Sequence, residues 1–175
     1  NTINIISNKT EFEIAMNKTL KLVTPTLDYG DIFSIGNLEI TVLETSHDAV
    51  MPCGYNIKDD KSTLTFATDL GYVSDKMQEY LNTSTCNVLE SNFDKIMLDY
   101  GKYPASIKNR IRGNFGHLSN EDTARAVYTT LSYNQDAKFI LSHLSENNNT
   151  QPLAQDTIFT YLKENNILNP DISFA

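Results

Sequence analysis

The sequence predicts a layered α/β fold built around a mixed β-sheet. Strand-type runs dominate residues 31–68, and strands alternate with helical patterns between residues 74 and 164, an order that is typical of layered α/β proteins. The length of 175 residues suits one domain with a sizeable core. A hydrophobic fraction of 40% with 21% charged residues is typical of a globular chain. We therefore expect a single domain over residues 1–175.

The predicted strands are short and are bounded by turn residues. Gly36-Asn37 indicates a tight hairpin turn, and Asp59-Asp60-Lys61 indicates a second hairpin. A first strand is predicted over residues 2–6, followed by a helix over roughly residues 10–20. The remaining predicted strands are 31–35, 38–45, 53–57, 62–68, 86–90 and 137–142.

The other predicted helices carry recognisable start signals. Ser74 is placed to cap a helix over residues 74–81, whose apolar residues recur at helical spacing. Ser119 opens a segment like a capping box, before a long helix that ends near Ser132. Further helices are predicted over residues 93–100, 104–112 and 152–164.

The charge of the chain limits the classes of partner. Its 14 Lys and Arg residues against 22 Asp and Glu residues leave a net charge of −8, which argues against broad attraction to nucleic acid or anionic membranes but leaves room for a local basic patch. No apolar run approaches the roughly 20 residues of a membrane helix, and no signal-peptide pattern is present, so we expect no membrane protein. Two cysteines are too few for a disulfide framework, which favours a cytoplasmic location.

A histidine or a carboxylate follows each of four predicted strands. These residues are His47, Asp69, Glu90 and His143. Ligands often bind at the carboxyl ends of strands, because rigid strands fix positions there while the loops stay open. Histidine nitrogens and carboxylate oxygens bind Zn²⁺ or a similar ion, and a short carboxylate can bridge two ions. His47, Asp69 and His143 are therefore candidate metal ligands. The alternative is that each histidine, taken singly, is a surface or capping residue.

The third histidine, His117, lies just before a predicted helix. A helix N-terminus has free N–H groups that suit an anion such as a phosphate, and a nearby histidine is able to donate a proton to a leaving oxygen. The alternative is that Gly116 makes a turn and His117 packs over the helix start.

A local run of basic residues precedes the His117 loop. On a chain of net charge −8 such a run is suited to steering a polyanion into a site. A solvated helix face is the alternative interpretation. The run consists of Lys102, Lys108, Arg110 and Arg112.

Five ordered motifs resemble those of the metallo-β-lactamase superfamily. The likeness is greatest to its WalJ/YycJ-type branch of nuclease-like proteins, akin to tRNase Z and other phosphodiesterases, and covers about residues 3–165. The motifs are His47-Asp48-Ala49 with Pro52 and Gly54-Tyr55, Ala67-Thr68-Asp69-Leu70-Gly71-Tyr72, Leu89-Glu90-Ser91-Asn92, Gly116-His117-Leu118-Ser119-Asn120 and His143-Leu144-Ser145.

The resemblance implies an αββα sandwich and a metal-dependent hydrolase, most closely a phosphodiesterase or exonuclease-like enzyme that acts on nucleic acid through a water activated by two divalent ions (zinc or manganese). By this likeness His47, Asp69 and His143 are metal ligands, and Asp69 bridges the two ions as a catalytic residue. His117 is the catalytic residue that contacts the scissile phosphate and assists the leaving group. The implied phosphate-binding and substrate-binding residues are His117, Ser119, Asn120, Lys108, Arg110 and Arg112.

One motif of the superfamily is missing. The His-x-His-x-Asp-His loop has no counterpart in the residues before His47, where no histidine occurs. We therefore expect the chain to be the C-terminal part of a longer protein, without the N-terminal portion of the sandwich. Three ligands shared by two ions complete neither coordination sphere, so metal binding by this chain alone is expected to be weak or absent. An exposed half-sheet also favours dimers or other association.

Two other functions stay open at this point. A hydrolase of the same fold that acts on a small phosphodiester or a thioester would suit the net charge of −8. A non-catalytic interaction module would suit a chain without the missing loop. The basic run before His117 favours nucleic acid as the substrate.

Overall fold

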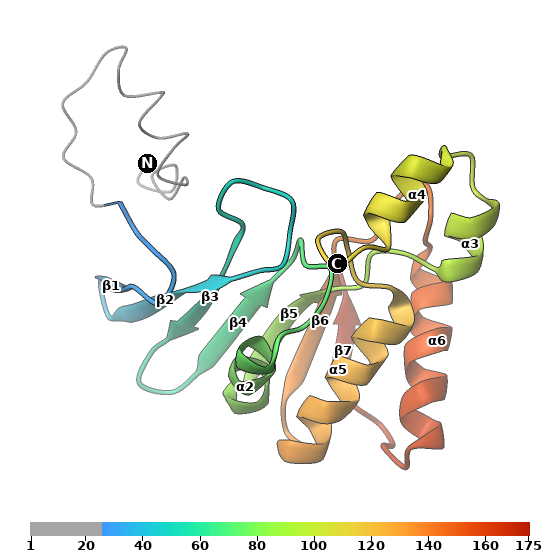
Figure 1. The fold of residues 1–175 in the computed structure, drawn as a ribbon. Helices are drawn as coiled ribbons and strands as arrows, with labels where there is room; N and C mark the ends of the chain where they lie inside the picture. The colour runs from blue at the N-terminus through green and yellow to red at the C-terminus, as the bar shows by residue number, and fades with distance from the viewer. Residues whose placement is uncertain (1–25) are drawn as a thin grey trace.

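The structure is a computed structural model that describes residues 26–175. The strand predicted over residues 2–6 and the helix predicted over residues 10–20 lie outside the described residues. Within the described part, the strands form one seven-stranded sheet in the order in which they occur in the chain (Figure 1). They are β1 (Ile32–Ile35), β2 (Leu38–Glu44), β3 (Cys53–Lys58), β4 (Thr63–Ala67), β5 (Cys86–Glu90), β6 (Lys138–Ser142) and β7 (Ile172–Phe174).

Strands β1 to β4 form an antiparallel meander. Ile35 pairs with Leu38, so the first hairpin turn consists of Gly36 and Asn37 as expected, and Gly36 has the positive φ of 63° that tight hairpin turns require. In the next hairpin, the Asp59 carboxylate accepts hydrogen bonds from two backbone N–H groups that follow it in the turn. Both expected hairpins are confirmed.

Strands β4 to β7 run parallel and are connected through helices. The caps expected from the sequence are confirmed, since the Ser74 and Ser119 side chains accept hydrogen bonds from the first turns of α2 and α5. None of the helices in the described part is long and apolar enough to cross a membrane. The helices are α2 (Asp75–Thr83), α3 (Lys95–Tyr100), α4 (Ala105–Ile111), α5 (Asn120–Tyr133) and α6 (Gln151–Glu164).

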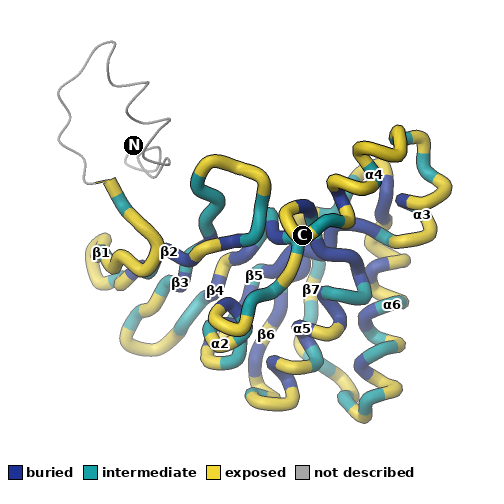
Figure 2. The backbone as a smooth tube through the Cα atoms, viewed as in Figure 1, coloured by how far each residue is buried: buried dark blue, intermediate teal, exposed yellow. Residues whose placement is uncertain are grey.

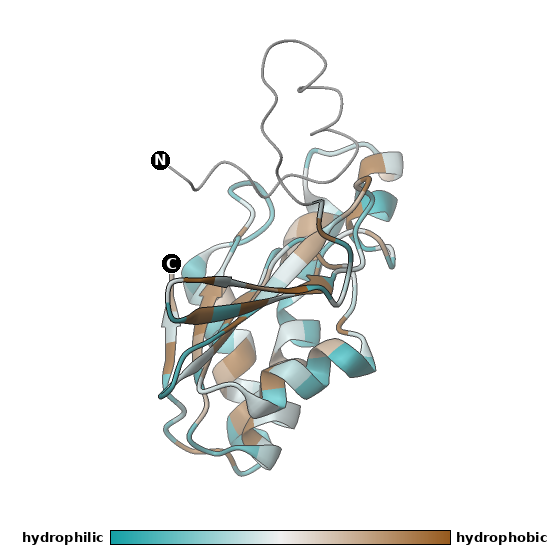
Figure 3. Cartoon of the chain, turned by 90° about the vertical axis from the view of Figure 1, so that its left-hand side faces the viewer, coloured by the Kyte–Doolittle hydropathy of each residue, from teal (hydrophilic) through white to brown (hydrophobic). Residues whose placement is uncertain are grey.

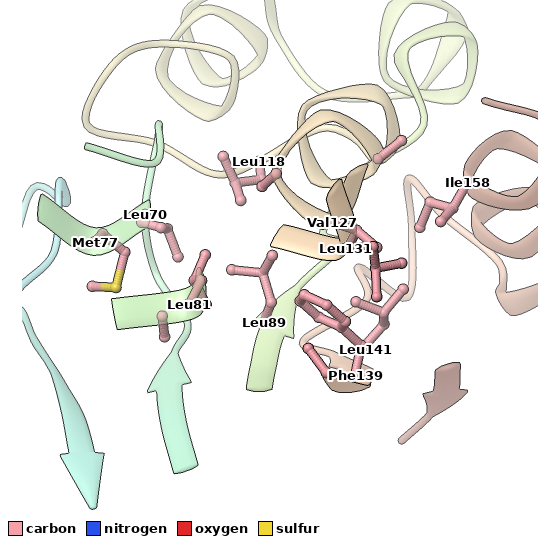
Figure 4. Packing of buried hydrophobic residues seen from close by; sticks show 14 of the residues in the cluster. Leu70, Met77, Leu81, Leu89, Leu118, Val127, Leu131, Phe139, Leu141 and Ile158 are labelled. Atoms are coloured by element: carbon pink, nitrogen blue, oxygen red, sulfur yellow. The ribbon is translucent and has the colours of Figure 1, made fainter. Parts of the chain in front are cut away.

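The main core lies between the sheet and helices α2, α5 and α6 (Figures 2 and 4). Leu89 and Leu141 project from the sheet into this core, where they belong to one buried cluster with Leu81, Val127 and Ile158. The layered α/β class and the mixed sheet are therefore confirmed. Of the layers of an αββα sandwich, the described residues form one sheet and one helical layer.

The opposite face of the sheet carries a second apolar row. Tyr55, Phe66, Val88 and Ile140 are neighbours across strands β3 to β6, and they point away from the core because side chains alternate along a strand. Phe66 keeps 40% of its surface exposed. Figure 3 shows the helices that cover the core on one side of the strands only. In the described part, this row is therefore an open apolar sheet face.

Strand β7 was not expected from the sequence. Its three residues are too few to show the alternation of apolar and polar residues that identifies a strand. The strand joins the sheet by parallel pairing with β6. Ile172 and Phe174 pack against the main core, so tertiary contacts rather than local preference place this strand.

Replacing a central core residue tests this packing. Leu89 is fully buried, so Leu89→Ala is expected to lower the free energy of unfolding by about 2–5 kcal/mol. The variant would bury less apolar surface and leave a cavity in the core. Urea denaturation measures the change. Leu168→Ala is the matched control, because Leu168 is 70% exposed, and its effect is expected to stay within about 0.5 kcal/mol. Equal losses for both variants would contradict the described core.

Candidate functional site

Five polar side chains meet at the carboxyl ends of the strands. His47 follows β2, Asp69 follows β4, Glu90 ends β5 and His143 follows β6, while His117 lies in the loop before α5. Because β4, β5 and β6 are parallel, their carboxyl ends meet at one edge of the sheet. We call these five residues the histidine–carboxylate site. The structure thus brings together the three histidines and Asp69, as the sequence predicted.

Asp69 lies at the centre of the three imidazole rings. Its Oδ1 atom is 3.8 Å from His47 Nε2, 3.8 Å from His117 Nδ1 and 3.7 Å from His143 Nε2. These separations are too long for hydrogen bonds. They are close to the spacing of two ligands around one ion, since zinc binds nitrogen and oxygen at about 2.0–2.2 Å.

Two of these residues have a left-handed backbone. Asp69 and His143 each have a φ of 56°, a region that few residues other than glycine adopt. His143 directly follows β6, and Asp69 comes two residues after the end of β4. Backbone strain of this kind persists where surrounding contacts over-determine it, and it gathers at functional sites. Both residues with this strained backbone lie at the same edge of the sheet, where their side chains approach each other.

Glu90 is a fully buried carboxylate beneath the histidines. Its Oε2 atom lies 3.1 Å from His117 Nδ1 and 2.9 Å from His143 Nδ1. Its Oε1 atom accepts hydrogen bonds from the backbone N–H groups of Leu70 at 2.9 Å and Leu118 at 3.1 Å. Burial alone would raise the pKa of Glu90, but the hydrogen bonds from the two histidines and the backbone hold this pKa below its usual value.

The charge on Glu90 fixes the orientation of both histidines. An ionised carboxylate only accepts hydrogen bonds, so His117 and His143 carry a proton on Nδ1 and leave Nε2 for another partner. The hydrogen bond to Glu90 raises the pKa of His143, burial opposes it, and the charges of Asp69 and Glu90 add to the rise. His47 Nδ1 lies 2.9 Å from the Gly116 carbonyl oxygen, so its Nε2 faces the carboxylates of Asp48 at 3.5 Å and Asp69 at 3.8 Å.

Close backbone contacts hold the His47 and His117 loops together. The Asp48 N–H donates to the Phe115 carbonyl at 3.1 Å, and the His117 N–H donates to the Ile111 carbonyl at 2.8 Å. Gly116 allows this approach, because a Cβ atom there would lie 2.2 Å from the Ile111 carbonyl oxygen. Glycine at this position is therefore a packing requirement of the site.

The donor atoms fit a divalent metal ion. His47 Nε2 and His143 Nε2 converge on Asp69 Oδ1, and His47 Nε2 also lies 3.5 Å from Asp48 Oδ1. Donor atoms of Asp69, Glu90, His117 and His143 also lie within 4.8 Å of one another, but Glu90 and the Nδ1 atom of His117 are hydrogen-bonded to each other. Three donors with open positions are typical of catalytic rather than structural zinc sites.

The basic run is divided between two places. Arg110 donates two hydrogen bonds to Asp48 beside His47, and this pairing lowers the pKa of Asp48. Lys108 donates to the Asp99 carbonyl at 2.7 Å, and Arg112 donates to the Asp99 carboxylate at 2.6 Å. Arg110 therefore lies at the rim of the site, whereas Lys108 and Arg112 tie α4 to α3.

Ser119 and Asn120, which were expected to cap the helix beside a phosphate, lie at the start of α5. Both residues are fully buried. The Ser119 hydroxyl caps α5 by accepting from the Asp122 N–H at 3.2 Å. The Asn120 side chain accepts from the Ser91 hydroxyl at 2.7 Å and from Asn149 at 2.8 Å. Their polar groups are thus used inside the fold, where they support the site from below.

Glu90 is the functional residue that the sequence did not single out as a site residue. Its signal was its place at the end of a strand, like that of Asp69 and His143. Asn92, two residues further on, donates to the His143 carbonyl at 2.8 Å and so helps to hold the left-handed backbone there. Both roles depend on contacts between segments far apart in the sequence.

Curated relatives share the sequence over most of this chain. The exodeoxyribonuclease YycJ of Bacillus anthracis is 38% identical over 135 residues, which cover 77% of this chain and 51% of that protein. The exodeoxyribonuclease WalJ of Streptococcus pneumoniae is 37% identical over 137 residues, with 78% and 51% covered. The chain spans about half the length of these curated relatives.

Solved structures share the fold at low sequence identity. The metallo-β-lactamase fold protein YhfI from Bacillus subtilis superposes with a TM-score of 0.66 at 16% identity, over 96% of this chain and 60% of that one. An isothiocyanate hydrolase from Delia radicum gut bacteria superposes with a TM-score of 0.56 at 18% identity, over 94% and 60%. Residues 6–144 match the family described as the beta-lactamase superfamily domain. The chain therefore belongs to the β-lactamase superfamily, and its fold is that of the metallo-β-lactamases.

Proposed function

We propose that the histidine–carboxylate site serves a metal-dependent hydrolase that cleaves phosphodiester bonds in DNA. The observation that carries the proposal is the convergence of His47 Nε2 and His143 Nε2 on Asp69 Oδ1, at 3.8 Å and 3.7 Å. Two relatives named exodeoxyribonucleases support DNA as the substrate. Arg110 lies at the rim of the site, where its guanidinium is paired with the Asp48 carboxylate.

Three residues would hold the metal. His47, Asp69 and His143 would supply the donor atoms, and the two oxygens of the Asp69 carboxylate would be available to two ions, zinc or manganese. The bound metal would supply an activated water and neutralise charge on the phosphate. These three ligands suffice for one ion with water but not for two complete coordination spheres, so two ions need ligands beyond those described.

His117 would act on the leaving group. Its Nδ1 atom is held by Glu90 at 3.1 Å, so its Nε2 atom is the one available to a substrate. A proton on Nε2 would pass to the leaving oxygen as the phosphorus–oxygen bond breaks. The hydrogen bond to Glu90 fixes the orientation of the ring, which removes the need to reorganise during the step.

Zinc binding distinguishes the proposed ligands from their neighbours. The wild-type chain is expected to bind zinc more weakly than submicromolar, because three ligands leave its sphere incomplete. His47→Asn and His143→Asn are each expected to lower this affinity by at least about tenfold. Losing a residue that only hydrogen-bonds to a metal ligand already costs about 10–100-fold in metal affinity, and losing the ligand itself costs more. Equilibrium dialysis measures the affinity.

The control for zinc binding is His117→Asn. The asparagine amide keeps a donor toward Glu90 but leaves the proposed ligands intact, so zinc affinity is expected to persist. Loss of zinc binding in His117→Asn, or tight binding of two ions by the wild-type chain, would contradict the proposed ligand set.

The choice of leaving group tests the role of His117. In the product of the complete reading frame, His117→Asn is expected to slow cleavage of single-stranded DNA by about 10²–10⁴-fold, the usual contribution of a general acid. Hydrolysis of bis(p-nitrophenyl) phosphate is expected to fall far less, because p-nitrophenolate leaves without a proton. Asn114→Ala, an exposed change in the same loop, is the control. Equal losses on both substrates would argue against an acid role.

We also propose that copies of this chain associate through the open apolar sheet face. Phe66 lies within that face and is 40% exposed, so a charge there would have to be desolvated on contact. Sedimentation velocity is expected to show oligomers of the wild-type chain that Phe66→Lys reduces. Tyr133→Lys adds the same charge at the end of α5 and is expected to change nothing. A wild-type monomer at all concentrations would refute the association.

A further inference from the structure

A cavity adjoins the histidine–carboxylate site beside the His47 loop. Its volume is about 380 Å³, within the roughly 300–1,000 Å³ of small-molecule sites. Leu43, Leu70 and Met77 contribute buried apolar walls, and Figure 4 shows Leu70 and Met77 among the residues of the main core. His47 lines this cavity and also belongs to the site. A molecule held at the site therefore has room to extend into the cavity.

Two exposed aromatic residues line the cavity. Tyr72 is 48% exposed and Phe115 is 63% exposed. The Ser46 hydroxyl accepts from the Tyr72 N–H at 3.0 Å and donates to the Tyr72 carbonyl at 2.9 Å. The Phe115 carbonyl accepts from the Asp48 N–H. Both backbones are thus anchored to the His47 loop, and anchored aromatic rings beside a polar site are suited to stacking on a flat ring.

The charged groups of the cavity do not suit a phosphate. Glu44 and Lys76 both line it, and within residues 26–175 neither side chain makes a hydrogen bond or an ion pair. Their opposite charges leave no net attraction for an anion. Burial raises the pKa of Tyr29, another lining residue, and the nearby charge of Glu44 adds to the rise. A carboxylate in this position is suited to accept hydrogen bonds from an amino group.

We propose that the cavity binds the nucleobase of the nucleotide next to the scissile phosphate. This proposal rests on the phosphodiesterase activity proposed above. The phosphate would lie at the histidine–carboxylate site, the base would stack on Tyr72 and Phe115, and its exocyclic amino group would face Glu44. Adenine, cytosine and guanine present such a group, whereas thymine does not. The cavity therefore favours a base with an exocyclic amino group over thymine at this position of a strand.

Binding of mononucleotides tests the proposal without any need for turnover. Ligand-observed NMR on the whole chain compares deoxyadenosine 5′-monophosphate, thymidine 5′-monophosphate and 2-deoxyribose 5-phosphate, which has the phosphate but no base. The adenine nucleotide is expected to bind best and the sugar phosphate least. Tyr72→Ala and Phe115→Ala are each expected to weaken adenine nucleotide binding about tenfold, the order of effect of losing a stacking partner.

Three further variants make the test specific. Tyr72→Phe keeps the ring and is expected to bind like the wild type. Glu44→Ala is expected to reduce the preference for the adenine over the thymine nucleotide. Tyr133→Ala is the matched control, because Tyr133 is an exposed tyrosine at the end of α5 that does not line the cavity. Its binding is expected to equal that of the wild type.

Several outcomes would overturn the proposal. Equal affinity for the sugar phosphate and the adenine nucleotide would show that the base makes no contact. Unchanged binding in both Tyr72→Ala and Phe115→Ala would remove the stacking surface. Weaker binding of a short adenine oligonucleotide than of the mononucleotide would assign the cavity to free nucleotides instead of a strand.

Failure of the proposed activity gives a different result. If the complete gene product hydrolyses no phosphodiester while base-dependent binding persists, the proposed function fails and the nucleobase site remains. If DNA is cleaved while the base has no effect on binding, the proposal for the cavity fails alone.

Discussion

The buried carboxylate of Glu90 is the group on which the candidate site depends. A charge removed from water costs several kcal/mol unless partners replace the lost hydration. Here two histidine rings and the backbone N–H groups of Leu70 and Leu118 replace it. These partners come from the loops after β4 and β6 and from the loop before α5. One side chain thereby fixes the relative positions of three loops.

The same network makes an unfavourable backbone tolerable. Asp69 and His143 adopt left-handed conformations, which would be unfavourable in an isolated peptide. The Leu70 N–H is bound to Glu90, and the His143 carbonyl accepts from Asn92. The residue next to Asp69 and the carbonyl of His143 are thus fixed from outside their own loops. Contacts from other segments of the fold therefore hold the side chains of the site.

The sequence predicted the elements of the fold better than the contacts within the site. Local signals such as the Ser74 and Ser119 caps lie close to the elements they define, and both are confirmed. The approach of His47 and His143 to Asp69 was expected from the strand ends, whereas that of His117 was expected only from the family resemblance. The role of Glu90 required knowledge of which donors converge on it. The pairing of Lys108 and Arg112 with Asp99 likewise depends on how α4 packs on α3.

The parallel arrangement of β4, β5 and β6 also determines when the site can form during folding. Parallel neighbours are separated by long stretches of chain, and contacts of high sequence separation form slowly because loop closure must come first. Glu90 meets His143 only after β6 has docked beside β5 across the intervening helices α3, α4 and α5. Partly folded forms therefore lack the assembled histidines. The assembled site therefore reports that this part of the chain has reached its native topology.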